Sequence, residues 1–429
     1  MGSLVARVDR FAPWPVVRVI LPLCFIAFHL IMLSALAKER FGIPFNAAPA
    51  AAPHFSDPAV DPIPANWERL IVSRWDSQHY ITLGLRGYRY CAPKEELGPK
   101  HYPDSDVVCQ LNFFPGYALL GRAVGWALHL PIDYALLAVS ILASYIVMFL
   151  WTSSEMVEAL GKGTVLISLL LLNVFTTGYE LVTLQTEPCA LLFTVGAFVL
   201  LERRWFFGSA LCAGAGSVIR PTGVAVSAAF GLALLWLTLR ERPTARTIAW
   251  RAFLCIVSAW GLLALFAFFH FRFGDALVYA HARERYYHYR PNPFALLWPS
   301  YTWIAQSLWA APNEGMWLAA GLLWFALGHK KALGGFSPTG RIYWYATYAL
   351  TVAIAAAGQV MIGFSGMSRY LLLATPMFFA MAAVMRKNFF ALALWIVISL
   401  AHYWSVNSCF YVGRGQPGFW QVCHIQPGA

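Results

Sequence analysis

The stretch "TLQTEPCALLFTVGAFVLLERRWFFGSALCAGAGSVIRPTGV", from Thr183 to Val224, alternates long apolar runs with a few basic residues. Two arginines separate the apolar runs at 188–202 and 205–219, and a third arginine ends the second run. A bilayer core demands about 17 to 25 apolar residues per helix, so short runs of this kind suit helices that cross a membrane in succession. The stretch therefore predicts an all-α polytopic membrane protein.

Composition supports this fold class along the whole chain. Of the 429 residues, 59% are hydrophobic and 12% are charged. The charged fraction of a soluble globular protein is about 25%, which excludes that class. The formal net charge is +11, but the Lys and Arg residues stand in short clusters between apolar runs. That distribution is typical of cytoplasmic membrane loops and not of a nucleic-acid partner.

Eleven apolar segments are long enough to be candidate spans. They lie near 16–37, 134–152, 163–179, 188–202, 205–219, 221–238, 252–271, 313–328, 343–363, 370–385 and 389–407. The basic clusters that orient them are Arg7, Arg10 and Arg18; Arg203 and Arg204; Arg240, Arg242, Arg246 and Arg251; Lys330, Lys331 and Arg341; and Arg386 and Lys387. With eleven spans all of these fall on one side, so we expect a cytoplasmic N-terminus and an outer C-terminus in a single membrane domain, 1–429.

The first segment has a second interpretation. The sequence "SALA" before Lys38 resembles a signal-peptide cleavage site, but the apolar run from Val16 to Ala37 is longer than a usual signal core. We expect an uncleaved helix.

This topology places three long segments outside, where function is expected: the first outer loop at 38–133, a second loop at 272–312, and the tail at 408–429. Within the first loop, 112–130 has apolar residues at helical spacing. They are Phe113, Phe114, Tyr117, Leu120 and Val124. This pattern predicts an amphipathic helix on the membrane surface.

The same loop contains "RWDSQHYITLGLRGY", from Arg74 to Tyr88. On a helix that starts at Trp75, four residues share one face: Asp76, His79, Tyr80 and Leu83. One interpretation is structural, because an acid in the first turn stabilises a helix and aromatic residues favour the interface. The other is that Asp76 is chemically active.

Four stretches resemble, in order, the motifs of the PIG-V-type mannosyltransferases, the family of eukaryotic GPI mannosyltransferase II and its bacterial relatives. They are "WDSQHYITLGLRGY", "NFFPGYALLGR", the opening stretch, and "SRYLLLATPMFF". The family belongs to the GT-C superfamily, so the resemblance implies the GT-C fold and sugar transfer from a polyprenyl-phosphate sugar on the non-cytoplasmic face. This chain departs from the pattern at Gly116, where the family usually has a bulky apolar residue.

Such a transfer with inversion needs a base near the acceptor hydroxyl, and Asp76 is the candidate. Phosphate is a good leaving group, so one carboxylate can suffice, while cations must hold the phosphodiester. We expect Arg220 and Arg369 to do so, with Arg283 and Arg285 of the second loop as further candidates. For each arginine taken alone, the alternative is an interfacial side chain that reaches lipid headgroups.

The remaining substrate-binding candidates are Trp75, His79, Tyr80 and Glu187. Glu187 also suits a helix start, with Thr186 as N-cap and Pro188 in the first turn. The resemblance gives Glu187 a hydrogen bond to a sugar, and the two interpretations are compatible.

No cofactor or metal is expected, because the nearest metal-like string, "PDSD" at 103–106, is typical of a turn. Four cysteines lie in apolar segments and are expected to be buried: Cys24, Cys189, Cys212 and Cys255. The other four lie outside and allow several disulfide pairings: Cys91, Cys109, Cys409 and Cys423. The absence of an N-x-[ST] sequon favours a bacterial plasma membrane over the endoplasmic reticulum.

The sequence thus predicts a mannosyltransferase whose partners are a polyprenyl-phosphate mannose donor, a glycan or glycolipid acceptor and membrane lipids. Two alternatives stay open. One keeps the fold with another donor sugar. The other is a transporter or flippase of a lipid-linked saccharide, which would be expected to show repeated halves and many polar residues inside its spans. Few such residues are present; Asn173, Gln359 and His402 are examples.

Overall fold

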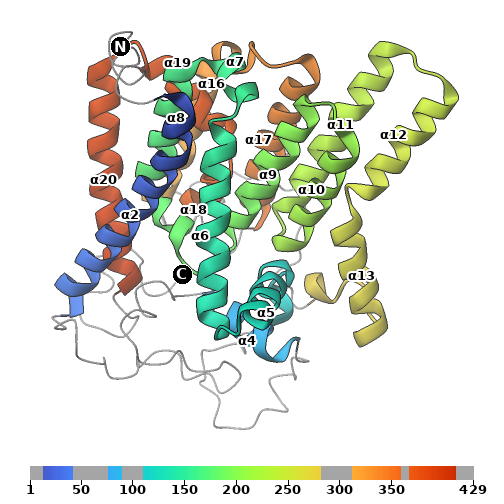
Figure 1. Ribbon diagram of the computed structural model, residues 1–429, viewed down its shortest axis with the longest axis horizontal. Coiled ribbons are helices and arrows are strands. Elements are labelled where there is room, and N and C mark those ends of the chain that lie inside the picture. The colour runs from blue at the N-terminus through green and yellow to red at the C-terminus, as the bar shows by residue number, and fades with distance from the viewer. Residues whose placement is uncertain (1–12, 42–75, 89–109, 282–311, 359–366, 412–429) are drawn as a thin grey trace.

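The computed structural model describes residues 13–41, 76–88, 110–281, 312–358 and 367–411, and all regular secondary structure in these ranges is helical (Figure 1). The elements are α2 (Trp14–Phe41), α4 (Ser77–Arg86), η2 (Gln110–Asn112), α5 (Gly116–Leu128), α6 (Ile132–Trp151), α7 (Ser154–Leu160), α8 (Lys162–Val174), η3 (Gly178–Val182), α9 (Glu187–Glu202), α10 (Phe206–Ile219), α11 (Gly223–Glu241), α12 (Ala245–Val257), α13 (Trp260–Phe273), α16 (Pro312–Leu333), α17 (Pro338–Gly358), α18 (Met367–Leu371), α19 (Pro376–Met385) and α20 (Phe389–Tyr411).

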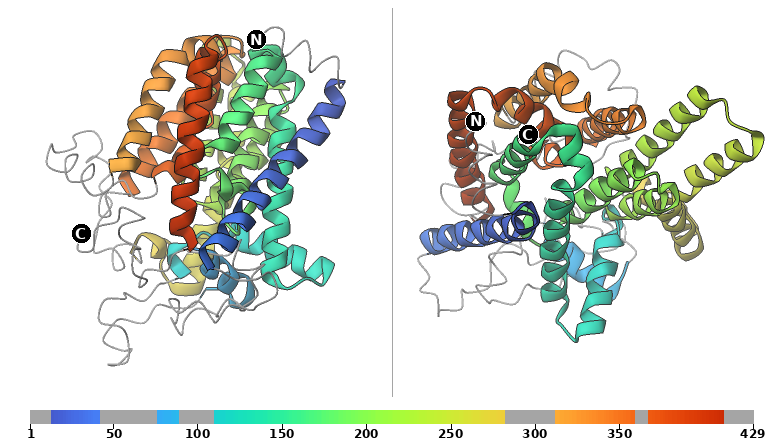
Figure 2. Two further views of the ribbon diagram at one scale, coloured as in Figure 1. Left: turned by 90° about the vertical axis from the view of Figure 1, so that its left-hand side faces the viewer. Right: turned by 45° about the horizontal axis from the view of Figure 1, so that its top comes forward.

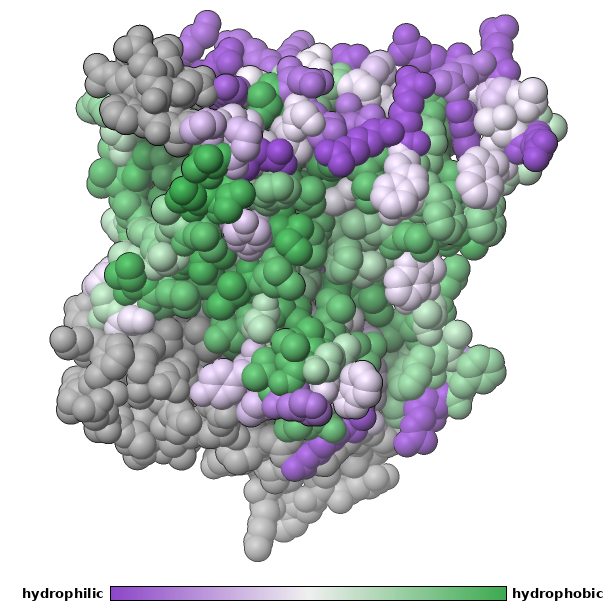
Figure 3. All heavy atoms as spheres, in the orientation of Figure 1, coloured by the Kyte–Doolittle hydropathy of each residue, from purple (hydrophilic) through white to green (hydrophobic). Residues whose placement is uncertain are grey.

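Apolar helices make this a helical membrane protein. Within the described ranges, α2, α6 and α11 are long and apolar enough to span a bilayer, and two bent pairs, α7 with α8 and α12 with α13, raise the number to five. Figure 3 shows a broad apolar band between a polar upper rim and a more mixed lower part. A band of this kind is expected where side chains meet lipid.

Each of the eleven predicted segments overlaps a helix, but three of them are broken. In the segment predicted at 163–179, α8 ends at Val174 and η3 begins at Gly178. The segment predicted at 252–271 consists of α12, which begins at Ala245, and α13, with a bend of 54° between them. The segment predicted at 370–385 consists of α18 and α19, and Pro376 stands in the first turn of α19. Proline lacks an N–H group, so Pro376 cannot donate to the preceding turn, which explains why α18 does not continue into α19.

The basic clusters between helices gather at one end of the bundle, which we call the basic end; it is uppermost in Figure 1. Arg203 lies there between α9 and α10, Lys330 ends α16, and Arg386 follows α19. Contacts across this end join separate loops: Arg386 donates to Thr164 at 3.1 Å, and Ser337 donates to Glu202 at 2.6 Å. The described residues therefore agree with the predicted segregation of basic residues to one side.

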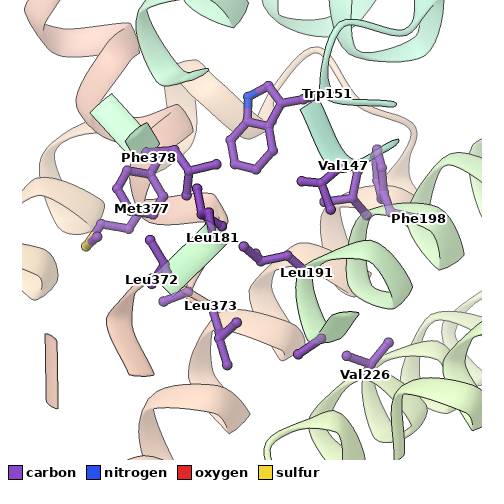
Figure 4. Packing of buried hydrophobic residues seen from close by; sticks show 14 of the residues in the cluster. Val147, Trp151, Leu181, Leu191, Phe198, Val226, Leu372, Leu373, Met377 and Phe378 are labelled. Carbon is purple, nitrogen blue, oxygen red and sulfur yellow. The ribbon is translucent and has the colours of Figure 1, made fainter. Parts of the chain in front are cut away.

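The core lies among the central helices, and Figure 4 shows part of it. Buried side chains meet there from α6, η3, α9, α11 and the α18–α19 segment; among them are Val147, Trp151, Leu181, Leu191, Phe198, Val226, Leu372, Met377 and Phe378. Helix α2 joins this bundle through His29, whose ring nitrogens lie 3.0 Å from Tyr403 Oη and 3.1 Å from Asn173 Oδ1. The predicted in-span polar residue Asn173 is thus part of a hydrogen-bonded network between α2, α8 and α20.

Helices α4 and α5 lie at the opposite end, which we call the site end (Figures 1 and 2). The predicted apolar face of α5 is divided between the bundle and the outside, and its contact with a membrane surface stays a prediction. Leu120 is 38% exposed, and the buried residues of the helix are Gly116, Tyr117, Ala118 and Gly121. A Cβ on Gly121 would lie 2.4 Å from Leu136, so α5 packs on α6 through small residues and turns its larger apolar side chains outward.

The expectation that the in-span cysteines are buried also needs one correction. Cys189 is buried, and Cys212 and Cys255 are half-buried, but Cys24 is exposed on α2. A helix at the edge of a bundle presents one side to lipid, where a small apolar side chain is equally stable. Cys91, Cys109 and Cys423 lie outside the described residues, and the side chain of Cys409 is not described either, so the disulfide expectation stays a prediction.

Candidate functional site

Asp76 immediately precedes α4, as a helix-start residue would. Its side chain, however, makes no capping hydrogen bond to the helix. The carboxylate instead accepts a hydrogen bond from Arg369 Nη1 at 2.6 Å, across 293 positions of sequence. Asp76 is therefore the point at which the start of α4 reaches the α18 segment.

Arg369 uses its guanidinium group to join three segments. Nη1 binds Asp76, Nη2 donates to Gln185 at 2.5 Å and to Glu187 Oε2 at 3.3 Å, and Nε donates to Glu187 Oε1. The planar, forked guanidinium suits several carboxylate and amide oxygens at once, which an ammonium group cannot match. Its position is fixed by the short helix α18, where Thr177 donates to the carbonyl oxygen of Ser368 at 3.1 Å.

Glu187 is the first residue of α9 and connects the two predicted arginines. Its Oε1 accepts from Arg220 Nη1 as well as from Arg369 Nε. The Glu187 side chain is 0% exposed, so the carboxylate is buried and both of its oxygens are engaged. The predicted helix start is confirmed, because Pro188 stands in the first turn, although Thr186 makes no side-chain cap.

Arg220 lies in the turn between α10 and α11, and small residues fix this turn. A Cβ on Gly223 would lie 1.9 Å from the carbonyl oxygen of Gly216, so α11 can start against α10 only with glycine at this position. The Arg220 guanidinium is 4.9 Å from the centre of the Tyr370 ring, an arrangement typical of a cation–π contact.

Gly116, the first residue of α5, makes a close backbone contact. A Cβ at this position would lie 2.7 Å from the carbonyl oxygen of Val218 and 2.9 Å from Ile219. The first residue of α5 therefore abuts the backbone just before Arg220, and a bulky side chain does not fit without moving one of the two. The start of α5 therefore packs directly on the segment that carries Arg220.

His79 and Tyr80 lie in the first turn of α4, which begins directly after Asp76, and their rings pack against other aromatic side chains. The His79 ring stacks on Phe113 at 4.3 Å, and Tyr80 makes edge contacts with Phe113 and Tyr117. Burial, and then the charge of Asp76, raises the pKa of Tyr80 above its usual range, while Arg369 and Arg220 act in the opposite direction. The phenol is thus neutral and within electrostatic reach of these charges.

Sequence reasoning missed two residues of this site. Glu180 of η3 is 5% exposed, and its Oε2 lies 3.4 Å from Arg369 Nε without a hydrogen bond to any described group. Gln185 accepts from Arg369 and donates to Ser77 at 3.3 Å, which ties α4 to the segment before α9. An acid one residue beyond the predicted span 163–179 was the available signal, because an isolated charge at such a depth is costly.

Five charged side chains thus form one cluster, the charged centre: Asp76, Glu180, Glu187, Arg220 and Arg369. Exposure falls across it, from 34% at Asp76 through 18% at Arg369 to 0% at Glu187. A ligand can therefore approach from the Asp76 side, where a carboxylate and a guanidinium lie next to each other.

Several predicted site residues lie outside the described ranges: Trp75, Arg283 and Arg285. So does the "PDSD" string. Of the four predicted site residues with described charges, Asp76, Glu187, Arg220 and Arg369, all meet in the charged centre. In the part of the chain that the structure describes, no three His, Cys, Asp or Glu side chains are grouped as metal ligands would be.

Comparison with known proteins found no match for this chain among family models, curated proteins or solved structures.

Proposed function

We propose that the protein is an inverting glycosyltransferase that moves a sugar from a polyprenyl-phosphate donor to a hydroxyl group of a lipid-linked or surface glycan. The observation that carries this proposal is the charged centre: a partly exposed carboxylate, Asp76, lies 2.6 Å from Arg369 and shares a cluster with Arg220. An acid and two cations are the groups that transfer from a lipid phosphate requires.

Asp76 is the proposed base because of its access. It is the most exposed acid of the charged centre, at 34%, whereas Glu187 is buried and bound by both arginines. A base must come within hydrogen-bond reach of the acceptor hydroxyl, and Asp76 meets that condition far better than Glu187. Glu187 then acts as a positioning residue that holds Arg220 and Arg369 side by side.

The two arginines would bind the donor phosphodiester and stabilise the charge on the released lipid phosphate. Arg369 faces the open side of the centre, and Arg220 lies behind it against Tyr370. Phosphate leaves readily, so no general acid is assigned. We assign no metal and no cofactor to the reaction.

The family resemblance extends this proposal to mannose as the sugar, to the GT-C fold with eleven spans, and to a bacterial plasma membrane with the site on the outer face. The support for this extension is the position of the motif residues around one cluster. Asp76 of the first motif, Gly116 of the second, Glu187 and Arg220 of the third, and Arg369 of the fourth lie at or against one cluster. Motifs far apart in sequence that meet around charged groups are what a shared active site would produce.

The experiment is sugar transfer from radiolabelled polyprenyl-phosphate mannose in membranes with matched expression of native chain, Asp76→Asn or Asp275→Asn. Asp275 is the matched control, because it lies outside the charged centre and pairs with His281 at 2.6 Å. We expect Asp76→Asn to lose about a hundredfold or more of transfer and Asp275→Asn to keep native activity.

Each opposite result removes a specific part of the proposal. Near-native transfer by Asp76→Asn would end the base assignment. A native chain that transfers no mannose to any of several acceptor extracts, but does transfer another polyprenyl-phosphate sugar, would move the donor assignment to that sugar. Translocation of a lipid-linked saccharide without any transfer would favour the flippase.

A further inference from the structure

The proposed base is already occupied. Arg369 Nη1 donates to Asp76 Oδ2 at 2.6 Å, so this carboxylate oxygen already accepts a charge-assisted hydrogen bond. A donor phosphodiester needs the same guanidinium. The base and the donor therefore compete for one set of N–H groups.

The remaining contacts of Arg369 show which of its bonds is exchangeable. Glu187 and Gln185 hold the other guanidinium nitrogens from the buried side, and the Glu187 side chain is fully buried. Asp76 binds from the open side and is 34% exposed. An incoming anion that replaces Asp76 would leave the guanidinium anchored in place, so the exchange needs no movement of α18.

We propose that the donor phosphate displaces Asp76 from Arg369, so that the base becomes free only when the donor is bound. This inference rests on the proposed function and adds an order of events to it. The lipid phosphate accepts from Nη1, the Asp76 carboxylate turns toward the acceptor hydroxyl, and transfer follows.

The acceptor oxygen forms a bond to the anomeric carbon while the bond from that carbon to the phosphate oxygen breaks. The acceptor proton goes to Asp76, and the electron pair of the broken bond leaves with the lipid phosphate, which stays against Arg369. When the phosphate departs and Asp76 loses its proton to water, the original ion pair forms again.

Exchange also sets the order of binding. Without donor, the Asp76 carboxylate is paired with Arg369, and it turns to an acceptor hydroxyl only after the donor has bound. Glu180 sits on the far side of Arg369, 3.4 Å from Nε, and does not face this exchange.

The test is equilibrium binding of a short-chain polyprenyl monophosphate, without sugar, to the purified full chain in nanodiscs. The variants are Asp76→Asn and Glu180→Gln. Asparagine no longer holds Arg369 by charge, so we expect Asp76→Asn to bind the phosphate about tenfold more tightly, even though it loses transfer. Glu180→Gln removes an acid that lies 3.4 Å from Arg369 Nε but does not accept from Nη1, so it is expected to tighten phosphate binding clearly less than Asp76→Asn does.

The outcomes separate the two proposals. If native chain binds the phosphate and Asp76→Asn binds it equally or more weakly, exchange is wrong while phosphate binding stands. If both variants bind more tightly by the same factor, a general charge effect replaces exchange. If neither native chain nor any variant binds a polyprenyl monophosphate, the proposed donor class and the exchange both fail.

Discussion

Both ends of the molecule contain arginine–glutamate ion pairs, but the pair at the basic end is exposed and the pairs at the site end are buried. At the basic end, Arg203 pairs with Glu155 at 2.7 Å while its side chain is 51% exposed. At the site end, Arg369 and Arg220 share Glu187, which is fully buried. Water and salt screen the first pair, and neither reaches the second to the same extent.

The difference teaches what each kind of pair is for. An exposed pair contributes about 0 to 1 kcal/mol, so stability depends little on it. The predicted part of its arginine is in the orientation of the chain in the membrane. A buried pair returns little net stability, yet losing one partner leaves an uncompensated charge and costs about 3 to 5 kcal/mol. A buried charged cluster of this kind is expected where its charges take part in binding or catalysis.

The largest effect is therefore expected from Glu187→Gln, which leaves Arg220 and Arg369 without their shared carboxylate. We expect a loss of about 3 to 5 kcal/mol, measured as a large fall in apparent melting temperature in detergent, together with loss of transfer. Glu155→Gln at the basic end is the control and should change stability by less than about 1 kcal/mol. Equal effects of the two variants would remove the contrast between the ends.

A steric change gives the next largest effect and sharpens the comparison. Gly116→Ala places a Cβ 2.7 Å from the Val218 carbonyl at the site end, and Gly335→Ala places one 2.0 Å from the Ala159 carbonyl at the basic end. Both should destabilise by about 1 to 3 kcal/mol. Only Gly116→Ala is expected to weaken binding of polyprenyl monophosphate, because it presses on the segment before Arg220. Matched binding by the two variants would contradict this.

The smallest effect is expected from Arg203→Ala. It breaks the exposed pair with Glu155 and should cost about 0.2 to 1 kcal/mol, less at 0.5 M salt than at low salt because the pair is screened. Melting curves at two salt concentrations measure this, and transfer activity should stay native. A loss that persists at high salt would show that Arg203 contributes packing as well as charge.

Much of the fold could be predicted from local sequence. Hydropathy predicted eleven apolar segments, and each of them overlaps a helix. Long apolar runs are required for burial in lipid or protein, so they can be recognised locally. It did not locate the break between α18 and α19 or the outward turn of Leu120, since both depend on which neighbour each helix meets. Whether all eleven segments cross the membrane stays a prediction.

The site divides in the same way. Asp76, Glu187, Arg220 and Arg369 were predicted from the sequence as charged residues within the motifs that carry the family resemblance, and the structure brings their side chains together. Glu180 and Gln185 were missed, because their part depends on contact with Arg369, which lies more than 180 positions away.

The sequence by itself thus determined a helical membrane protein with basic residues on one side and a few charged side chains beside its apolar runs. These features follow from composition and order alone, since the transfer of each segment into lipid is a local property. Only the tertiary structure decided that Asp76 is held by Arg369 and that Glu187 joins two arginines. Such pairings form only when helices that are far apart in the sequence pack closely enough for hydrogen bonds. Small residues such as Gly116 and Gly223 allow this close packing.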